Sequence, residues 1–264
     1  MKNQVVFFPC DFSALAQHTL QELVLWQGAK MKELIIFHVA ARTESSGIVK
    51  RKTPDELYHD LKAAIPELDK IPHHFEWVHG ISEDQIIQRA HDIQIDWMVM
   101  PSKGAKGLEH LWGSRSERIL RETSMPAIII PPKSVLHSMT KIAFATDFQQ
   151  DINEGMLLPL LDLLDSTGAE LDVISVNLAH KDLSMSQRIN KRHLKNKLRH
   201  LSPSFNTHMH KGAISTGLSD YCKQNQVDML CIQSKISGGI SRLWEESISQ
   251  SVLLEARLPI MVLK

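Results

Sequence analysis

The sequence predicts an α/β protein built from two tandem doubly wound domains, each with a five-stranded parallel sheet. Two observations predict this class. Short apolar runs typical of buried strands alternate with helical patterns, and the alternation that begins at residue 5 starts again at residue 141. Alternation of this kind places parallel strands side by side, with helices on both faces of the sheet. A chain of 264 residues is long enough for two such domains.

The first half opens on a β-rich run at residues 5–8 and continues into a helical pattern. Ser13 is a suitable N-cap for this helix, and Gly28 is a suitable stop. Residues 33–39 form an apolar run typical of a strand that is covered on both faces. Thr53, just before a proline, opens a second helix. The remaining elements are expected as strands at 74–78, 96–100 and 126–130 and as helices at 82–94 and 114–122.

The second half repeats these elements in the same order. Asp147-Phe148 falls on Asp11-Phe12 when the two halves are aligned. The other matches are residues 170–176 on 33–39, Gly212 on Gly80 after the third strand, 228–232 on 96–100, and 259–262 on 126–129. Five strands that recur in register indicate a duplicated domain. We therefore expect domain 1 at residues 1–132, a linker at 133–139 and domain 2 at 140–264.

Charge and composition exclude several classes of function. The 30 basic and 30 acidic side chains cancel, so no bulk field draws the chain to nucleic acid or to an anionic membrane. No apolar run approaches the roughly 18 residues that span a bilayer, and we expect a soluble, cytoplasmic protein. The three cysteines, Cys10, Cys222 and Cys231, are interpreted as reduced thiols. Cys10 is interpreted as buried filler, with a reactive thiol as the alternative.

The stretch from residue 100 to residue 116 gathers most of the chemistry of the first half. It follows a short apolar strand and runs into a helix, so it is a strand–loop–helix corner. Gly104 and Gly107 permit a close approach of the backbone to a ligand, and the amide groups at Gly113-Ser114 begin the helix. Such a corner suits an anion, above all a phosphate. The alternative is purely structural, because Ser114 and Glu117 have the spacing of a capping box.

The repeated unit resembles the universal stress protein domain over essentially the whole chain. The marks are a first strand ending in Pro9-Cys10-Asp11 before Phe12-Ser13, a second strand ending in His38-Val39, and a glycine-rich corner ending in Gly113-Ser114. The resemblance implies the strand order 3-2-1-4-5. This order reverses between strands 1 and 4, where ligands of open α/β sheets bind at the carboxyl ends of the strands. It further implies a stress-response protein that binds an adenine nucleotide, ATP, together with Mg.

The same resemblance implies which residues of domain 1 form the nucleotide site. Pro9 belongs to the strand end beside the site, Asp11 and Val39 flank the adenosine, and Met100 lies near the base. The phosphates are expected at Gly104, Gly113, Ser114 and Ser116, with Lys103, Lys106 and Arg115 as nearby cations. The glycine motif departs from the pattern of the family, because Pro101 holds the first glycine position and the loop is one residue short.

The second copy departs further. Gln233 occupies the position of Pro101, Ile236 replaces Gly104, and Glu245-Glu246 replace Gly113-Ser114. A carboxylate about 4 Å from a phosphate costs roughly 4 kcal/mol at an effective dielectric constant near 20, about three decades of affinity. We therefore expect domain 2 to bind no nucleotide triphosphate in the manner of the family.

Other features leave alternatives open. Residues 190–201 form a basic helix that either meets a partner or is a solvated face, and His208 with His210 is a weak metal signal. No signature of catalysis is found, and we expect a binding protein rather than an enzyme. A nucleotide-independent adaptor and a slow nucleotide hydrolase that uses Asp11 and a metal are the alternatives.

The resemblance also implies how the two domains associate. In the family, pairing runs through the fifth strands, here residues 127–130 and 260–263, which are apolar in both copies. We expect an intramolecular pseudo-dimer, which also covers sheet edges that would otherwise invite association. A further homodimer and a protein partner are left open.

Overall fold

The computed structural model describes residues 4–27, 30–40, 52–102, 114–177, 182–211, 213–233 and 258–264. These residues divide into two compact units, the first reaching His137 and the second beginning at Ser138. Among the described residues, no helix is both long and apolar enough to cross a membrane.

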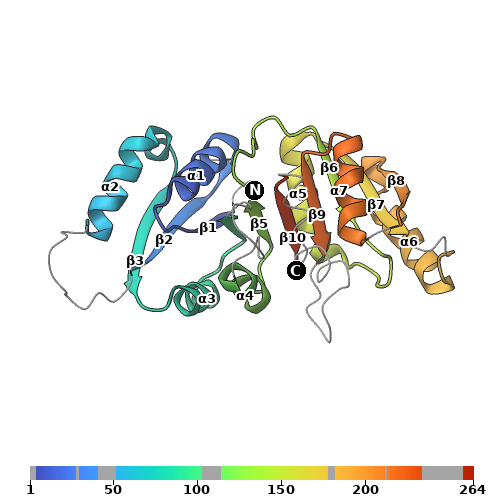
Figure 1. The fold of residues 1–264 in the computed structure, drawn as a ribbon, viewed down its shortest axis with the longest axis horizontal. Helices are drawn as coiled ribbons and strands as arrows, with labels where there is room; N and C mark the ends of the chain where they lie inside the picture. The colour runs from blue at the N-terminus through green and yellow to red at the C-terminus, as the bar shows by residue number, and fades with distance from the viewer. Residues whose placement is uncertain are drawn as a thin grey trace. The chain divides into compact units, whose positions relative to one another are not determined.

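Unit 1 is an α/β sandwich (Figure 1). Its elements are β1 (Val5–Pro9), α1 (Ala14–Gln27), β2 (Glu33–Ala40), α2 (Pro54–Ala64), the 3₁₀ turn η2 (Pro66–Lys70), β3 (His73–His79), α3 (Ser82–Asp92), β4 (Trp97–Pro101), α4 (Ser114–Glu122) and β5 (Ala127–Ile130). The strands are parallel and lie in the order β3-β2-β1-β4-β5. The predicted fold class and strand order are thus confirmed for this unit.

Unit 2 repeats the same plan. Its elements are β6 (Lys141–Ala145), α5 (Glu154–Thr167), β7 (Glu170–Asn177), α6 (Met185–Lys197), the 3₁₀ turn η3 (Arg199–Leu201), β8 (Ser204–Met209), α7 (Ile214–Gln224), β9 (Met229–Gln233) and β10 (Ile260–Leu263). Its parallel strands follow the order β8-β7-β6-β9-β10, the counterpart of the order in unit 1.

The helices of unit 1 form two groups. Both α1 and α2 contact η2, whereas α3 contacts α4. In Figure 1 the first group lies above the strands and the second group below them. The central strand β1 is therefore covered on both sides, and Phe7 and Phe8, which point to opposite faces, are both fully buried.

Helix ends follow the local sequence. The hydroxyl of Ser13 accepts a hydrogen bond from the amide of Ala16 at 3.2 Å, which confirms Ser13 as the N-cap of α1. Thr53 and Glu56 form a complete capping box at the start of α2. The helix expected at 82–94 is shorter, because Ile93 adopts an extended conformation with φ −124° and ends α3 at Asp92.

An aspartate in each unit binds the beginning of the first strand. The Asp96 carboxylate accepts from the amide of Val5 at 2.7 Å, and the Asp228 carboxylate accepts from the amides of Thr140 and Lys141 at 2.7 and 2.9 Å. These aspartates hold matching places in the two repeats. They connect the fourth strand of each unit to its first strand, the pair between which the strand order reverses.

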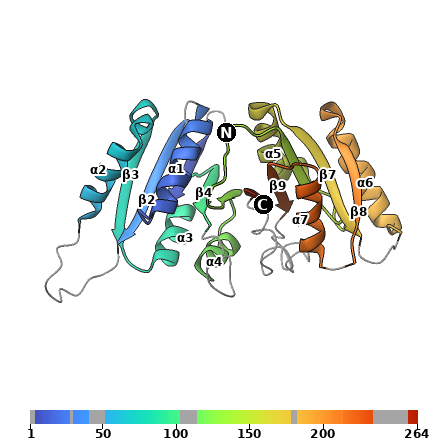
Figure 2. The same ribbon diagram turned by 45° about the horizontal axis from the view of Figure 1, so that its top comes forward.

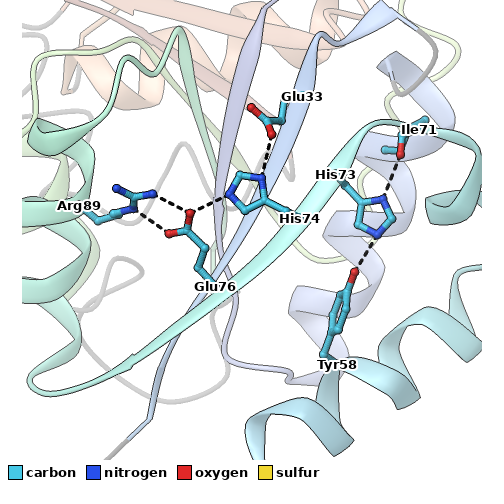
Figure 3. A network of polar contacts seen from close by, with 7 residues as sticks. All are labelled: Glu33, Tyr58, Ile71, His73, His74, Glu76 and Arg89. Carbon is cyan, nitrogen blue, oxygen red and sulfur yellow. Dashed lines mark hydrogen bonds and ion pairs between the residues drawn. The ribbon is translucent and has the colours of Figure 1, made fainter.

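A polar network joins β2, β3 and α3 (Figure 3). His74 lies between two carboxylates, with Nδ1 2.8 Å from Glu33 and Nε2 2.7 Å from Glu76. Arg89 on α3 donates two hydrogen bonds to the carboxylate of Glu76, at 2.7 and 2.6 Å. At the adjacent residue of β3, His73 Nε2 lies 2.7 Å from the hydroxyl of Tyr58 on α2. These contacts fasten the edge strand β3 to β2, α2 and α3.

Candidate functional site

The carboxyl ends of β2, β1 and β4 form the floor of the candidate site in unit 1. Pro9 is in register with Phe37 on β2, and Phe7 is in register with Met98 on β4. Because adjacent strands lie about 4.8 Å apart, this register brings the ends of the three strands together. Three of the predicted site residues, Pro9, Val39 and Met100, lie on these strands.

The loop after β1 is shaped by Asp11. Its Oδ1 accepts a hydrogen bond from the amide of Ser13 at 3.0 Å, and the Phe12 between them has φ 57°. A left-handed conformation is unfavourable for a bulky residue, and the carboxylate stabilises it by closing an Asx turn. Asp11 is exposed, and its second oxygen, Oδ2, has no partner among the described residues.

His38 holds this loop against β2. Its Nδ1 donates a hydrogen bond to the carbonyl of Cys10 at 2.7 Å, while the amide of Cys10 donates to the carbonyl of Phe37 at 2.8 Å. The ring of Phe12 packs on the ring of His38, with centroids 4.8 Å apart, and on that of Phe75 at 5.8 Å. The sequence analysis noted His38 only as a family mark, because its contact with Cys10 joins residues 28 positions apart.

Ser102, directly after β4, carries an unsatisfied polar atom. Its side chain is only 5% exposed, and its hydroxyl has no hydrogen-bond partner among the described residues. Buried hydroxyls are ordinarily paired, since an unpaired one costs about 1–3 kcal/mol. Sequence reasoning missed Ser102, because a single serine beside a glycine loop has no distinctive pattern.

Cys10 is a buried thiol and not a reactive one. Its side chain is 4% exposed, and burial raises the pKa of its thiol to about 12. A thiol of this kind is almost entirely protonated at neutral pH and is a poor nucleophile. The interpretation of Cys10 as filler therefore holds, and Cys222 and Cys231 are likewise free and buried.

The matching loop of unit 2 has the same backbone but different surroundings. Asp147 Oδ1 accepts from the amide of Gln149 at 3.0 Å, and Phe148 has φ 56°. Here α6 closes over the loop. The side-chain amide of Gln187 (Nε2) donates to the carbonyl of Asp147 at 2.8 Å, and that of Asn190 (Nδ2) donates to the carbonyl of Phe148 at 2.9 Å.

Two cations strengthen this closure. The ammonium group of Lys191 lies 5.3 Å from the centroid of the Phe148 ring, and Lys197 donates to the Ile152 carbonyl at 2.6 Å. Phe148 is only 2% exposed, whereas Phe12 in unit 1 is half-buried. In the described part of unit 1, no residue of α2 hydrogen-bonds to the loop after β1. The two loops thus share a backbone conformation, but among the described residues only the second one receives hydrogen bonds from the helix that follows the second strand of its unit.

Several predicted phosphate-binding residues lie outside the described residues. These are Lys103, Gly104, Lys106 and Gly113, and in domain 2 Ile236, Glu245 and Glu246. Ser114 and Arg115 begin α4, although their side chains are not among those described, and Ser116 is half-buried in its first turn. Met100 is 4% exposed, so its side chain belongs to the core.

His208 and His210, the pair that the sequence offers as a weak metal signal, lie at the end of β8. The rings of His208 and His210 stack with centroids 6.2 Å apart, and His210 Nδ1 lies 3.7 Å from Asp220. Within the described ranges, no group of three or more His, Cys, Asp or Glu side chains is placed to hold a metal ion.

Comparison with known proteins identifies the repeated unit. The model of the universal stress protein family matches the chain twice, at residues 2–131 and 139–264. The universal stress protein MJ0577 of Methanocaldococcus jannaschii is 26% identical over 157 residues, which span 49% of this chain and 95% of that protein.

Solved structures share the fold over the full length of the chain. A universal stress protein from Archaeoglobus fulgidus superposes with a TM-score of 0.72 at 18% identity, covering 100% of this chain and 97% of the other. A functionally unknown protein from Pseudomonas aeruginosa PAO1 superposes with a TM-score of 0.66 at 14% identity, covering 99% and 92%. The chain therefore belongs to the universal stress protein family and carries two copies of its domain in tandem.

Proposed function

We propose that domain 1 binds an adenine nucleotide, with ATP as the first candidate, and that the bound nucleotide acts as a state signal in the response to stress. One observation carries the proposal. Among the described residues, α2 makes no hydrogen bond to the loop after β1 in unit 1, whereas α6 hydrogen-bonds to the matching loop in unit 2. The loop after β1 lies at the point where the strand order reverses, the usual ligand site of open α/β sheets.

The polar groups at this point suit a nucleoside. Asp11 uses Oδ1 to hold its own loop, which leaves Oδ2 available to accept a hydrogen bond from a ribose hydroxyl. The buried hydroxyl of Ser102 lies at the end of the neighbouring strand β4 and has no partner among the described residues. A ligand that pairs with this hydroxyl would remove the cost of leaving it unsatisfied.

Domain 2 is proposed to bind no nucleotide. The sequence supports this view through Glu245-Glu246, which stand where Gly113-Ser114 stand in domain 1. The closure of the Asp147 loop by α6 supports it independently, because a nucleoside would have to displace Gln187, Asn190 and Lys191. The tandem protein is therefore proposed to have a single nucleotide site.

Calorimetric titration of the intact protein with Mg-ATP tests this proposal. Asp11→Ala removes the candidate ribose acceptor, and Asp147→Ala removes the matching Asx turn in unit 2 as a control. We expect about one equivalent of ATP to bind, a loss of roughly tenfold or more in affinity for Asp11→Ala, and an unchanged affinity for Asp147→Ala. The double variant Gly113→Glu/Ser114→Glu, which places the residues of domain 2 in domain 1, is expected to abolish binding.

Two results would overturn the proposal. The absence of heat, together with no competition against a fluorescent ATP analogue, would show that the protein binds no ATP. Binding that survives Asp11→Ala but weakens in Asp147→Ala would place the nucleotide in domain 2.

A further inference from the structure

Charge is strongly segregated along the second half of the chain. Residues 183–219 contain seven Lys or Arg and four His but no Asp or Glu, although the whole protein has 30 basic and 30 acidic residues. Most of these cations lie on α6 and η3. The basic residues are thus concentrated in one contiguous part of unit 2.

Helix α6 is held firmly in place by its inner face. Leu194 and Leu198 are buried, at 2% and 0% exposure. Ser184 and Gln187 form a complete capping box at its start, and Gln187 and Asn190 also bind the loop after β6. A helix anchored along its length presents its outer side chains on a fixed backbone, which lowers the entropy lost when a partner binds.

Several cations of α6 already have partners. Lys191 and Lys195 lie over the rings of Phe148 and Phe205, at 5.3 and 5.0 Å from the centroids. Lys197 contacts Asp151 at 3.0 Å, and the same carboxylate lies 3.5 Å from His193. Burial and the nearby charge of Lys195 lower the pKa of Lys191, as expected where cations are crowded.

The arginines of this segment are different. The side chains of Arg192 on α6 and Arg199 on η3 are exposed, and their guanidinium groups make no hydrogen bond or ion pair within the part of the chain that the structure describes. Arg188 is also exposed, and it uses only its Nε to donate to the carbonyl of Leu183 at 2.9 Å. Arg188 and Arg192 lie one helical turn apart on the exposed side of α6, and Arg199 lies in η3 just beyond the end of this helix.

Two exposed apolar side chains lie beside the arginines. Met185 is 73% exposed and Ile189 is 38% exposed, and they stand one helical turn apart next to Arg188 and Arg192. We propose that the outer face of α6, together with Arg199 of the adjoining η3, docks an acidic protein segment, whose carboxylates pair with Arg188, Arg192 and Arg199 and whose apolar side chains pack on Met185 and Ile189. This proposal concerns a face and a domain that the proposed nucleotide site does not use.

The observations favour a protein segment over other polyanions. Sites for single-stranded nucleic acid combine basic residues with exposed aromatic rings on which bases stack, and α6 has no Phe, Tyr or Trp. A helix that lies in a membrane surface presents a wide apolar face, whereas α6 exposes only Met185 and Ile189 among its large apolar side chains. Arginine pairs well with carboxylates through two parallel hydrogen bonds, and two apolar contacts suit a mixed acidic and apolar peptide. Figure 2 shows α6 beside β7 and β8, with α7 on the other side of these strands.

Fluorescence anisotropy with the full-length protein tests the proposal. The probe is a fluorescein-labelled amphipathic peptide rich in Glu with Leu one helical turn apart, compared with a peptide in which Gln replaces every Glu. Arg192→Glu/Arg199→Glu should weaken binding by about tenfold or more, and added salt should weaken binding to the unaltered protein. The control Lys32→Glu/Lys70→Glu makes the same change in net charge at exposed lysines of unit 1 and should leave affinity within about twofold. Met185→Ala/Ile189→Ala should weaken binding even at high salt, where the apolar contacts remain.

Several results would contradict the proposal, and some of them would assign the outer face of α6 to another kind of partner. Equal weakening by both charge-reversal variants, or no binding of the Glu peptide, would overturn the proposal. Tighter binding to single-stranded DNA or to phosphatidylserine vesicles, lost in Arg192→Glu/Arg199→Glu, would replace the protein segment with that polyanion. Self-association in sedimentation that the same variant abolishes would assign the face to a second copy of the chain. Unchanged ATP titration and circular dichroism of the variants show that folding and the nucleotide site are unaffected.

Discussion

Glu76 shows how the surroundings of one residue determine its behaviour. Partial burial alone would raise the pKa of its carboxyl group, but hydrogen bonds from Arg89 and His74, together with their charges, outweigh burial and lower the pKa below its usual 4.5. The ion pair with Arg89 spans β3 and α3, so the carboxylate contributes to the packing of an edge strand (Figure 3).

We expect Glu76→Gln to destabilise the protein by about 1 kcal/mol near neutral pH. A carboxyl group whose pKa is lowered by folding stabilises the protein above its unfolded pKa, and this stability is lost as the pH falls through the folded pKa. The difference between the two proteins should therefore be full above about pH 5.5 and should shrink below 4.5. Urea unfolding across this range measures it, with Glu170→Gln as the control, because the Glu170 side chain is 82% exposed. A difference that does not depend on pH would contradict the assignment.

At the scale of elements, equivalent helices have different roles in the two repeats. α2 follows the second strand of unit 1 and α6 follows the second strand of unit 2, yet only α6 hydrogen-bonds to the loop after the first strand among the described residues. The sequence analysis placed a basic helix at 190–201. The structure begins it earlier, at Met185, because Ser184 and Gln187 cap it, and ends it at Lys197 before η3.

Gln187→Ala/Asn190→Ala should loosen the contact between α6 and the loop after β6. We expect amide hydrogen exchange in residues 147–152 and at the start of α6 to become several-fold faster. The two substitutions remove both hydrogen bonds to the loop and the capping bond from the amide of Ser184 to Gln187, each of about 1 kcal/mol. Asn196→Ala, at an exposed position of the same helix, controls for the change in helix propensity. If both variants raise exchange equally, the contacts with Asp147 and Phe148 are not what holds the loop.

At the scale of the whole molecule, duplication has produced two units with the same strand order and different loop environments. The Asx turn and the left-handed phenylalanine recur at Asp11-Phe12 and Asp147-Phe148. The difference lies in which side chains reach that loop. The proposal of a single nucleotide site rests on this difference, and the pairing of the two domains through their fifth strands likewise stays a prediction.

Mg-ATP should therefore stabilise the two units unequally. At about 100 times its dissociation constant a ligand adds roughly 2.7 kcal/mol to the state that binds it. We expect slower hydrogen exchange at residues 9–13 and 97–102 and unchanged exchange at residues 145–149. Equal protection of both loops would contradict the single-site proposal, and ADP measured alongside shows whether the γ-phosphate contributes.

The sequence alone determined the α/β class, the duplication, the positions of the strands and the N-cap at Ser13, because these depend on local periodicity and on short-range hydrogen bonds. The family resemblance added the strand order, and with it the neighbourhood of Pro9, Val39 and Met100. Only the tertiary structure decided the contact of His38 with Cys10, the unpaired hydroxyl of Ser102 and the closure of the Asp147 loop by α6. Each of these depends on side chains that folding brings together from distant parts of the chain, and no local pattern encodes such an encounter.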